Sequence, residues 1–225
     1  MTMRTPGEDE DLAAGFLLSE GVISGPDDLI ALVSSGEGDA VDVTLGAAAA
    51  AQLDRHLQAR RHVTATSACG VCGRQNAEAL NFDAPPITAT WTIPATVVDG
   101  LPSRLRAAQT TFEQTGGLHA AGVFTLDGTL IESAEDVGRH NAVDKVLGRL
   151  LRARHLPLSD CVLCVSGRAS FELVQKAVRG GLPMLVAVSA PSSLAIDLAR
   201  QRGVTLAGFV RGDGFNVYAH AHRIA

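Results

Sequence analysis

The chain has 225 residues, of which 46% are hydrophobic, and its formal net charge is -5. This length allows a globular fold of one or two domains, and an acidic balance without a run of Lys or Arg argues against a sequence-independent grip on nucleic acid. The longest apolar stretches, such as 182–190, are far shorter than the roughly 20 residues that a membrane helix needs. We therefore expect a protein that binds no nucleic acid and spans no membrane.

The N-terminal residues lead into an acidic run and contain no apolar signal segment, so we expect a cytoplasmic protein. The reducing cytoplasm keeps thiols from pairing. For the four cysteines, catalysis or metal binding is therefore a better expectation than a structural disulfide.

The first 85 residues are expected to form a smaller α+β lobe. Apolar residues at helical spacing predict a helix around 12–17, and alternation predicts a strand over 41–45. An Ala-rich helix then ends near Arg60, a weak strand over 62–68 leads into Cys69-Gly-Val-Cys72, and a short helix follows over 74–80. Residues 81–89, with two adjacent prolines, are typical of a linker.

Residues 86–225 alternate regularly between helices and strands. A helix with one apolar face is expected to end at Gly116-Gly117, and two strands follow around the Asp127-Gly128 turn. That face comprises Val98, Leu101, Leu105, Ala108 and Phe112. The remaining helices are expected over 143–151, 171–178 and 194–199, and the remaining strands over 161–165, 184–188 and 205–210. Such alternation predicts an α/β sheet with helices on both faces.

The Cys69-x2-Cys72 pair is the strongest chemical candidate. A thiolate is the nucleophile in sulfur chemistry, and a following helix start with Arg74 lowers a cysteine pKa. Gly70 and Gly73 give backbone freedom, so one thiol can hold a persulfide that the other releases. A zinc site would need two further ligands, and no second pair has the right spacing; a thioredoxin-type disulfide stays open. Cys161 and Cys164 point to opposite faces of a strand and are expected to be core residues.

Two glycine-containing loops follow predicted strands. Ser166, Gly167 and Arg168 precede a helix and suit a phosphate cradle, although an ordinary helix cap with a surface Arg explains them equally well. The second loop follows the last strand, where open α/β sheets bind ligands. In it Arg211 can meet a phosphate, Asp213 can accept from a guanine edge, and Gly212 and Gly214 allow close approach; a tight turn with a salt-bridged Arg is the alternative. The second loop comprises Phe209, Val210, Arg211, Gly212, Asp213 and Gly214.

Two histidines also need an interpretation. His140 lies in a polar helix start with Asp136, Asp144 and Lys145, which indicates either a solvated face or, as we favour, a cleft wall with His140 as proton donor or acceptor. For His119, a glycine hinge followed by a satisfied core histidine is the better expectation.

Seven blocks, taken together and in order, resemble the formate dehydrogenase accessory sulfurtransferase family over essentially the whole chain. They are Met3-Arg-Thr-Pro-Gly, Asp11-Leu to Ser19-Glu-Gly, Cys69-Gly-Val-Cys-Gly, Gly116-Gly-Leu-His, Glu135-Asp-Val-Gly-Arg-His-Asn-Ala-Val-Asp-Lys, Ser166-Gly-Arg-Ala-Ser and Gly212-Asp-Gly-Phe-Asn-Val-Tyr.

The resemblance implies a cytidine-deaminase-like three-layer domain over 86–225, after an N-terminal lobe over 1–85. It implies a protein that takes persulfide sulfur from a cysteine desulfurase and sulfurates the bis-molybdopterin guanine dinucleotide cofactor for formate dehydrogenase. Cys69 matches the persulfide-bearing cysteine, Cys72 its partner, and Phe209 to Gly214 the cofactor-contacting segment. The molybdenum cofactor is then a bound substrate, with no permanent metal, and a homodimer is expected.

Two rival functions remain. A cofactor-binding chaperone without sulfur transfer needs the anion sites but not the thiols. A zinc-dependent deaminase relic needs a His-x-Glu and a Pro-Cys-x-x-Cys pair, and neither occurs at the expected helix starts, so zinc hydrolysis is not expected.

Overall fold

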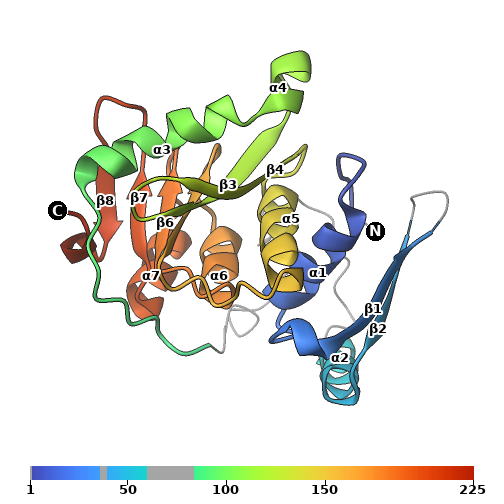
Figure 1. Cartoon of the computed structure of the whole chain (residues 1–225). Coiled ribbons are helices and arrows are strands. Elements are labelled where there is room, and N and C mark those ends of the chain that lie inside the picture. Colours follow the sequence, from blue (N-terminus) through green and yellow to red (C-terminus); the bar gives the residue numbers. More distant parts are fainter. Residues whose placement is uncertain (1, 36–39, 60–83) are drawn as a thin grey trace.

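The computed structural model describes residues 2–35, 40–59 and 84–225 (Figure 1). The expected strand over 62–68, the Cys69-x2-Cys72 pair and the expected helix over 74–80 lie outside these ranges. Within the described ranges, no helix is both long and apolar enough to cross a bilayer.

A mixed six-stranded sheet forms the centre of the fold, in the order β4-β3-β5-β6-β7-β8. Its middle strands β5, β6 and β7 are parallel, whereas β4, β3 and β8 join through antiparallel pairs. The bounds are β3 (His119–Thr125), β4 (Leu130–Asp136), β5 (Cys161–Val165), β6 (Met184–Ala187), β7 (Thr205–Gly208) and β8 (Asn216–Ala219). Strand β8 was not expected from the sequence.

Helices cover both faces of the sheet, which confirms the expected three-layer α/β arrangement (Figure 1). Helix α3 (Ala95–Ala107) packs on one face against Phe124, Val162 and Met184. The other face carries α5 (Arg139–Arg152), α6 (Phe171–Arg179) and α7 (Ser193–Arg202). The alternating strand positions point to two different cores because successive side chains leave opposite faces of a strand.

The N-terminal part begins with α1 (Asp9–Ser19), which packs so closely against α5 that the backbones of the two helices are in direct contact. A Cβ on Gly15 would lie 1.8 Å from the carbonyl oxygen of Asp144. After η1 (Pro26–Asp28) come a two-stranded sheet, β1 (Leu29–Ser34) with β2 (Val41–Leu45), and α2 (Ala47–Ala59); η3 (Ala221–Arg223) lies near the C-terminus. Helix α1 shares a core with the sheet, and the boundary near residue 85 stays a prediction.

The helical face expected over 98–112 is divided into two helices. Helix α3 ends at Ala107 and α4 (Thr110–Thr115) begins three residues later. The Glu135 carboxylate explains the break, because its two oxygens accept from the main-chain N–H groups of Thr111 and Phe112, each at 2.7 Å. An acid at these unpaired N–H groups favours a new helix start.

Two polar residues of α5, Asp144 and Lys145, were expected on a solvated face or a cleft wall, but both are buried. Asp144 and Lys145 are 2% and 1% exposed. The Lys145 ammonium lies 2.9 Å from a carboxylate oxygen of Asp136, and Asp144 accepts from Lys176 at 2.7 Å and from Ser19 at 2.6 Å. These partners come from distant segments, and charges can be buried here because each is paired.

Candidate functional site

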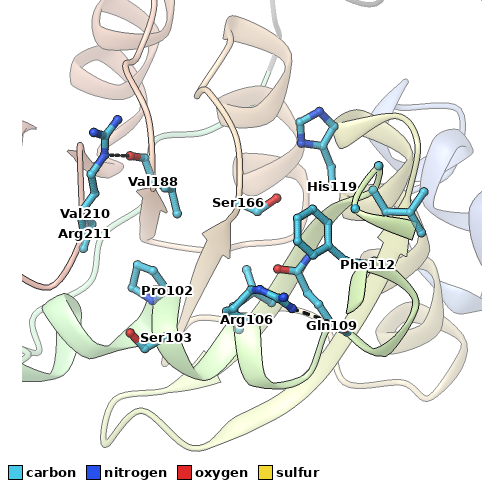
Figure 2. A pocket seen from close by; sticks show the side chains of 14 residues that line it. Pro102, Ser103, Arg106, Gln109, Phe112, His119, Ser166, Val188, Val210 and Arg211 are labelled. Carbon is cyan, nitrogen blue, oxygen red and sulfur yellow. Dashed lines mark hydrogen bonds between the residues drawn. The ribbon is translucent and has the colours of Figure 1, made fainter. Parts of the chain in front are cut away.

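A cavity of about 690 Å³ opens between α3, α4 and one edge of the sheet (Figure 2). Ser166 follows β5, Val188 follows β6 and Arg211 follows β7, so the carboxyl ends of all three parallel strands reach it. The antiparallel neighbour β3 contributes its first residue, His119, at the same edge. This is the edge at which open α/β sheets bind ligands.

The charged side chains that line the cavity are all basic. Arg106 and Arg211 line it with His119, and no Asp or Glu is among its described lining residues. The Arg106 guanidinium lies over the Phe112 ring, 4.5 Å from the centroid, and Arg211 donates to the Val188 carbonyl at 3.3 Å. A concave wall with cations and no carboxylate concentrates positive potential and attracts anions.

The expected nucleotide segment after β7 reaches the cavity with two of its six residues. Val210, which is buried, and Arg211 line it. Phe209 is 39% exposed, and Gly212, Asp213 and Gly214 are exposed outside the lining. Gly212 and Gly214 have φ of 90° and 121°, a left-handed backbone that favours glycine, and the Gly214 N–H donates to Asp99 at 3.3 Å.

The loop after β5 places Ser166 in the cavity wall, where its hydroxyl oxygen accepts from the Ala120 N–H at 2.8 Å. Gly167 fits between two side chains, since a Cβ there would lie 3.3 Å from Nδ1 of His119 and 3.6 Å from Cδ of Arg139. Arg168 is exposed beside the cavity lining. The side chain of Ser170, the residue that caps α6, makes no capping bond, so an ordinary serine cap there does not explain this loop.

His140 lies outside the cavity lining. Its Nε2 is 2.9 Å from the Ser170 hydroxyl and 3.0 Å from a carboxylate oxygen of Glu172. Burial lowers the pKa of His140, and the nearby charges of Arg139 and Lys176 act in the same direction. A role for His140 at the ligand therefore stays a prediction.

The expectation of a satisfied core histidine at position 119 is wrong. His119 is half-buried and lines the cavity, and its ring makes no hydrogen bond to the residues that the structure describes. Burial lowers the pKa of His119, and the charges of Arg139 and Arg168 lower it further.

Arg106, Gln109 and Phe112 were also missed as cavity residues. They lie in what the sequence presents as one amphipathic helix; in the structure Arg106 belongs to the last turn of α3, Gln109 to the connection and Phe112 to α4. The available signal was Arg106 with an aromatic residue, Phe112, six positions later.

The four cysteines fall into two groups. Cys69 and Cys72 lie outside the described residues. Cys164 is buried in the core under α3 and Cys161 is half-buried, which confirms the expectation that both belong to the core of the sheet. Burial raises the pKa of both thiols.

Residues 1–225 match the FdhD/NarQ family. The sequence is 52% identical over 241 residues to the sulfur carrier protein FdhD of Streptomyces avermitilis, covering 100% of this chain and 83% of that protein. It is 50% identical over 229 residues to the protein of the same name from Nocardia farcinica, covering 100% and 81%.

A similar solved structure is that of a formate dehydrogenase accessory protein from Desulfotalea psychrophila. It has a TM-score of 0.76 and 28% identity, and the match covers 100% of this chain and 83% of that one. A guanine deaminase from Nitrosomonas europaea is more distant, with a TM-score of 0.43 and 18% identity over 63% of this chain and 93% of its own.

Proposed function

Because this chain belongs to the FdhD/NarQ family, we propose that it carries sulfur as a persulfide on Cys69 and delivers it to a bis-molybdopterin guanine dinucleotide cofactor. A cysteine desulfurase supplies the sulfur, and formate dehydrogenase uses the sulfurated cofactor. Cys72 holds or releases the persulfide, and two copies of the chain act together as a homodimer. The reaction takes place in the cytoplasm, where thiols stay reduced.

The basic lining of the cavity is the observation that carries this proposal. In a chain with a net charge of -5, the cavity gathers Arg106, Arg211 and His119 and has no carboxylate among its described lining residues. Such an arrangement favours a ligand with several negative charges, as a dinucleotide has.

The size and surface of the cavity also suit a nucleotide. Its volume of about 690 Å³ falls in the usual range for small-molecule sites. Phe112, Val188 and Val210 give the wall apolar surface for a flat ring, and Arg211 stands at the carboxyl end of β7 with exposed N–H groups for a pyrophosphate. Gly212, Asp213 and Gly214, together with Gly167 and Arg168, stand next to this wall and are proposed to close on the ligand.

The sulfur-loading step transfers one sulfur atom from the persulfide of the desulfurase cysteine to the Cys69 thiolate. The Cys69 thiolate attacks the terminal sulfur of the desulfurase persulfide, a new S–S bond forms at Cys69, and the desulfurase cysteine leaves as a thiolate. No electrons are gained or lost, and the proton on the terminal sulfur stays with it.

Mass spectrometry tests this step directly. After incubation with a cysteine desulfurase and cysteine, we expect the intact protein to gain about 32 Da, the mass of one sulfur atom. The gain should be lost in Cys69→Ala and kept in Cys161→Ala, which removes a half-buried thiol of β5. An adduct that survives Cys69→Ala and Cys72→Ala together would contradict a persulfide on this pair.

The same cavity supports a second function, a chaperone that carries the cofactor without moving sulfur. The basic side chains among its described lining residues, Arg106 and Arg211, can attract an anionic ligand without a thiol. Cells that contain only the double Cys→Ala variant distinguish the two functions, because a pure chaperone restores formate dehydrogenase activity and a sulfur carrier does not.

A further inference from the structure

One end of the cavity is formed by the start of β3 and the loop after β5. His119 and Ser166 line it, joined through Ala120, whose N–H donates to Ser166 Oγ at 2.8 Å and whose carbonyl accepts from the Ser166 N–H at 3.0 Å. Because the Ser166 oxygen is held as an acceptor, its hydroxyl hydrogen can point to the cavity. This end therefore offers a hydroxyl donor and an imidazole side by side.

The His119 ring has no fixed hydrogen-bond partner in the part of the chain that the structure describes. Its neighbours include two cations: the His119 ring and the Arg139 side chain both pack against Gly167, and the charges of Arg139 and Arg168 act on the ring. Burial and these two charges lower the pKa of His119, so the free protein holds a neutral imidazole at neutral pH.

We propose that His119 takes up a proton when an anionic group of the ligand binds at this end of the cavity. The inference rests on the proposed function, a dinucleotide site, and adds the residue that couples ligand capture to protonation. An anion beside Arg139 and Arg168 offsets their repulsion and attracts the imidazolium itself. The direction is fixed: the bound anion raises the pKa of His119, and His119 then donates a charge-assisted hydrogen bond to the anion.

The charges around the ring are predominantly positive. Asp136, which pairs with His119 in the β3–β4 register, is bound to the Lys145 ammonium at 2.9 Å. Among the described residues, the other charged or titratable groups around this end of the cavity include the cations Arg106, Arg139, Arg168 and Arg211, His140 with its carboxylate partner Glu172, and Glu135, which accepts from the N–H groups of Thr111 and Phe112. A bound anion would add negative charge at this end of the cavity, where the described lining contains no carboxylate.

Calorimetry with guanosine diphosphate mannose tests the proposal, because the pyrophosphate diester of this compound does not titrate between about pH 6 and pH 8, where a histidine does. Binding heats measured in two buffers with different ionisation enthalpies give the number of protons taken up. We expect net uptake by the native protein, and an affinity that weakens with rising pH by at most about tenfold per pH unit.

The variant His119→Gln keeps a polar side chain that cannot titrate. It should still bind, with little or no proton uptake and a nearly flat pH profile. His155→Gln, an exposed histidine after α5, is the matched control and should behave like the native protein. Should His119→Gln fail to fold, the Cε1 NMR signal of His119 in the native protein answers the same question, since its midpoint should move to higher pH when the ligand is added.

The outcomes separate this inference from the function on which it rests. Binding with no proton uptake, or uptake that persists in His119→Gln, overturns the role of His119 and leaves the nucleotide site standing. Absence of binding to the native protein at every pH overturns both.

Discussion

The interface of α1 with α5 and the cavity under α3 both contain several cations, but the two regions differ in whether carboxylates pair with those cations. At the interface, Arg149 donates to Asp11 at 3.1 Å and to Glu132 at 2.7 Å, and Lys145 lies 2.9 Å from Asp136. In the cavity, the carboxylate recorded near Arg106 among the described residues is that of the exposed Glu113, at 4.0 Å, and both Arg106 and Arg211 donate to main-chain carbonyls.

The difference separates charges that stabilise the fold from charges that we propose bind a ligand. A buried cation is tolerated when a carboxylate compensates it, as at the interface. Cations without such partners gain most from an anion that arrives from outside, as we propose for the cavity. Changes at the interface should therefore alter stability, and changes in the cavity should alter binding.

The largest effect is expected at the closest contact of the interface. Gly15→Ala places a Cβ 1.8 Å from the Asp144 carbonyl oxygen, and α1 must move away from α5. We expect a loss of more than about 4 kcal/mol in the free energy of unfolding, measured by denaturant titration. Gly100→Ala in α3 is the control, because its Cβ would meet nothing closer than 3.9 Å; there we expect no loss and up to about 1 kcal/mol of gain. Equal stability of the two variants would contradict the packing described.

The second effect concerns the buried pair of Asp144 and Lys176. Lys176→Met leaves a buried carboxylate without its cation, and we expect a loss of about 3 to 5 kcal/mol. Arg154→Ala, which removes an ion pair whose side chains are 65% and 82% exposed, should cost less than about 1 kcal/mol.

The pH dependence of the Lys176→Met variant sharpens the test. Burial raises the pKa of Asp144, and Lys176 opposes that rise in the native protein. Without Lys176 the folded state binds a proton more readily than the unfolded chain, so stability is retained at low pH and lost as the pH rises through the folded-state pKa. The deficit should therefore shrink as the pH falls; a deficit that grows on acidification would contradict the assignment.

The smallest effect on stability, and the clearest on binding, is expected at Arg211. Arg211→Ala should weaken binding of guanosine diphosphate mannose by roughly tenfold to a hundredfold, because a charged hydrogen bond is worth about 1.5 to 3 kcal/mol. Its free energy of unfolding should change by less than about 0.5 kcal/mol, since the side chain is exposed. Arg200→Ala, at the exposed end of α7 on the opposite face of the sheet, should leave affinity unchanged.

The central elements of the fold could be predicted because their signals are local. Strand β5 is a continuous apolar run with the predicted bounds, and α6 begins at the predicted residue and ends one residue after the predicted end. The break before α4 could not be predicted, since the Glu135 carboxylate that causes it lies more than twenty residues away. Strand β8 is half-exposed and short, and its alternation is weak.

The residues of the site that lie in loops after strands were predictable, and those on α3 and β3 were not. Ser166, Val210 and Arg211 were expected from glycine-containing turns after strands, and they line the cavity. His119 and Arg106 were not expected, because their exposure depends on a cavity whose walls come from segments far apart in the sequence. For Asp144 and Lys145 the error had the same origin: polar residues at a helix start are normally solvated, and only their distant partners bury them.

The inward position of Cys164 on β5 has a practical consequence. Its side chain is fully enclosed between the central strands and α3, and burial raises the pKa of its thiol, so alkylating reagents can reach it only after the sheet opens. The rate at which Cys164 is alkylated therefore reports how often the protein opens globally. It distinguishes a preparation that has unfolded from one that stays folded but has lost the proposed sulfur-carrying capacity.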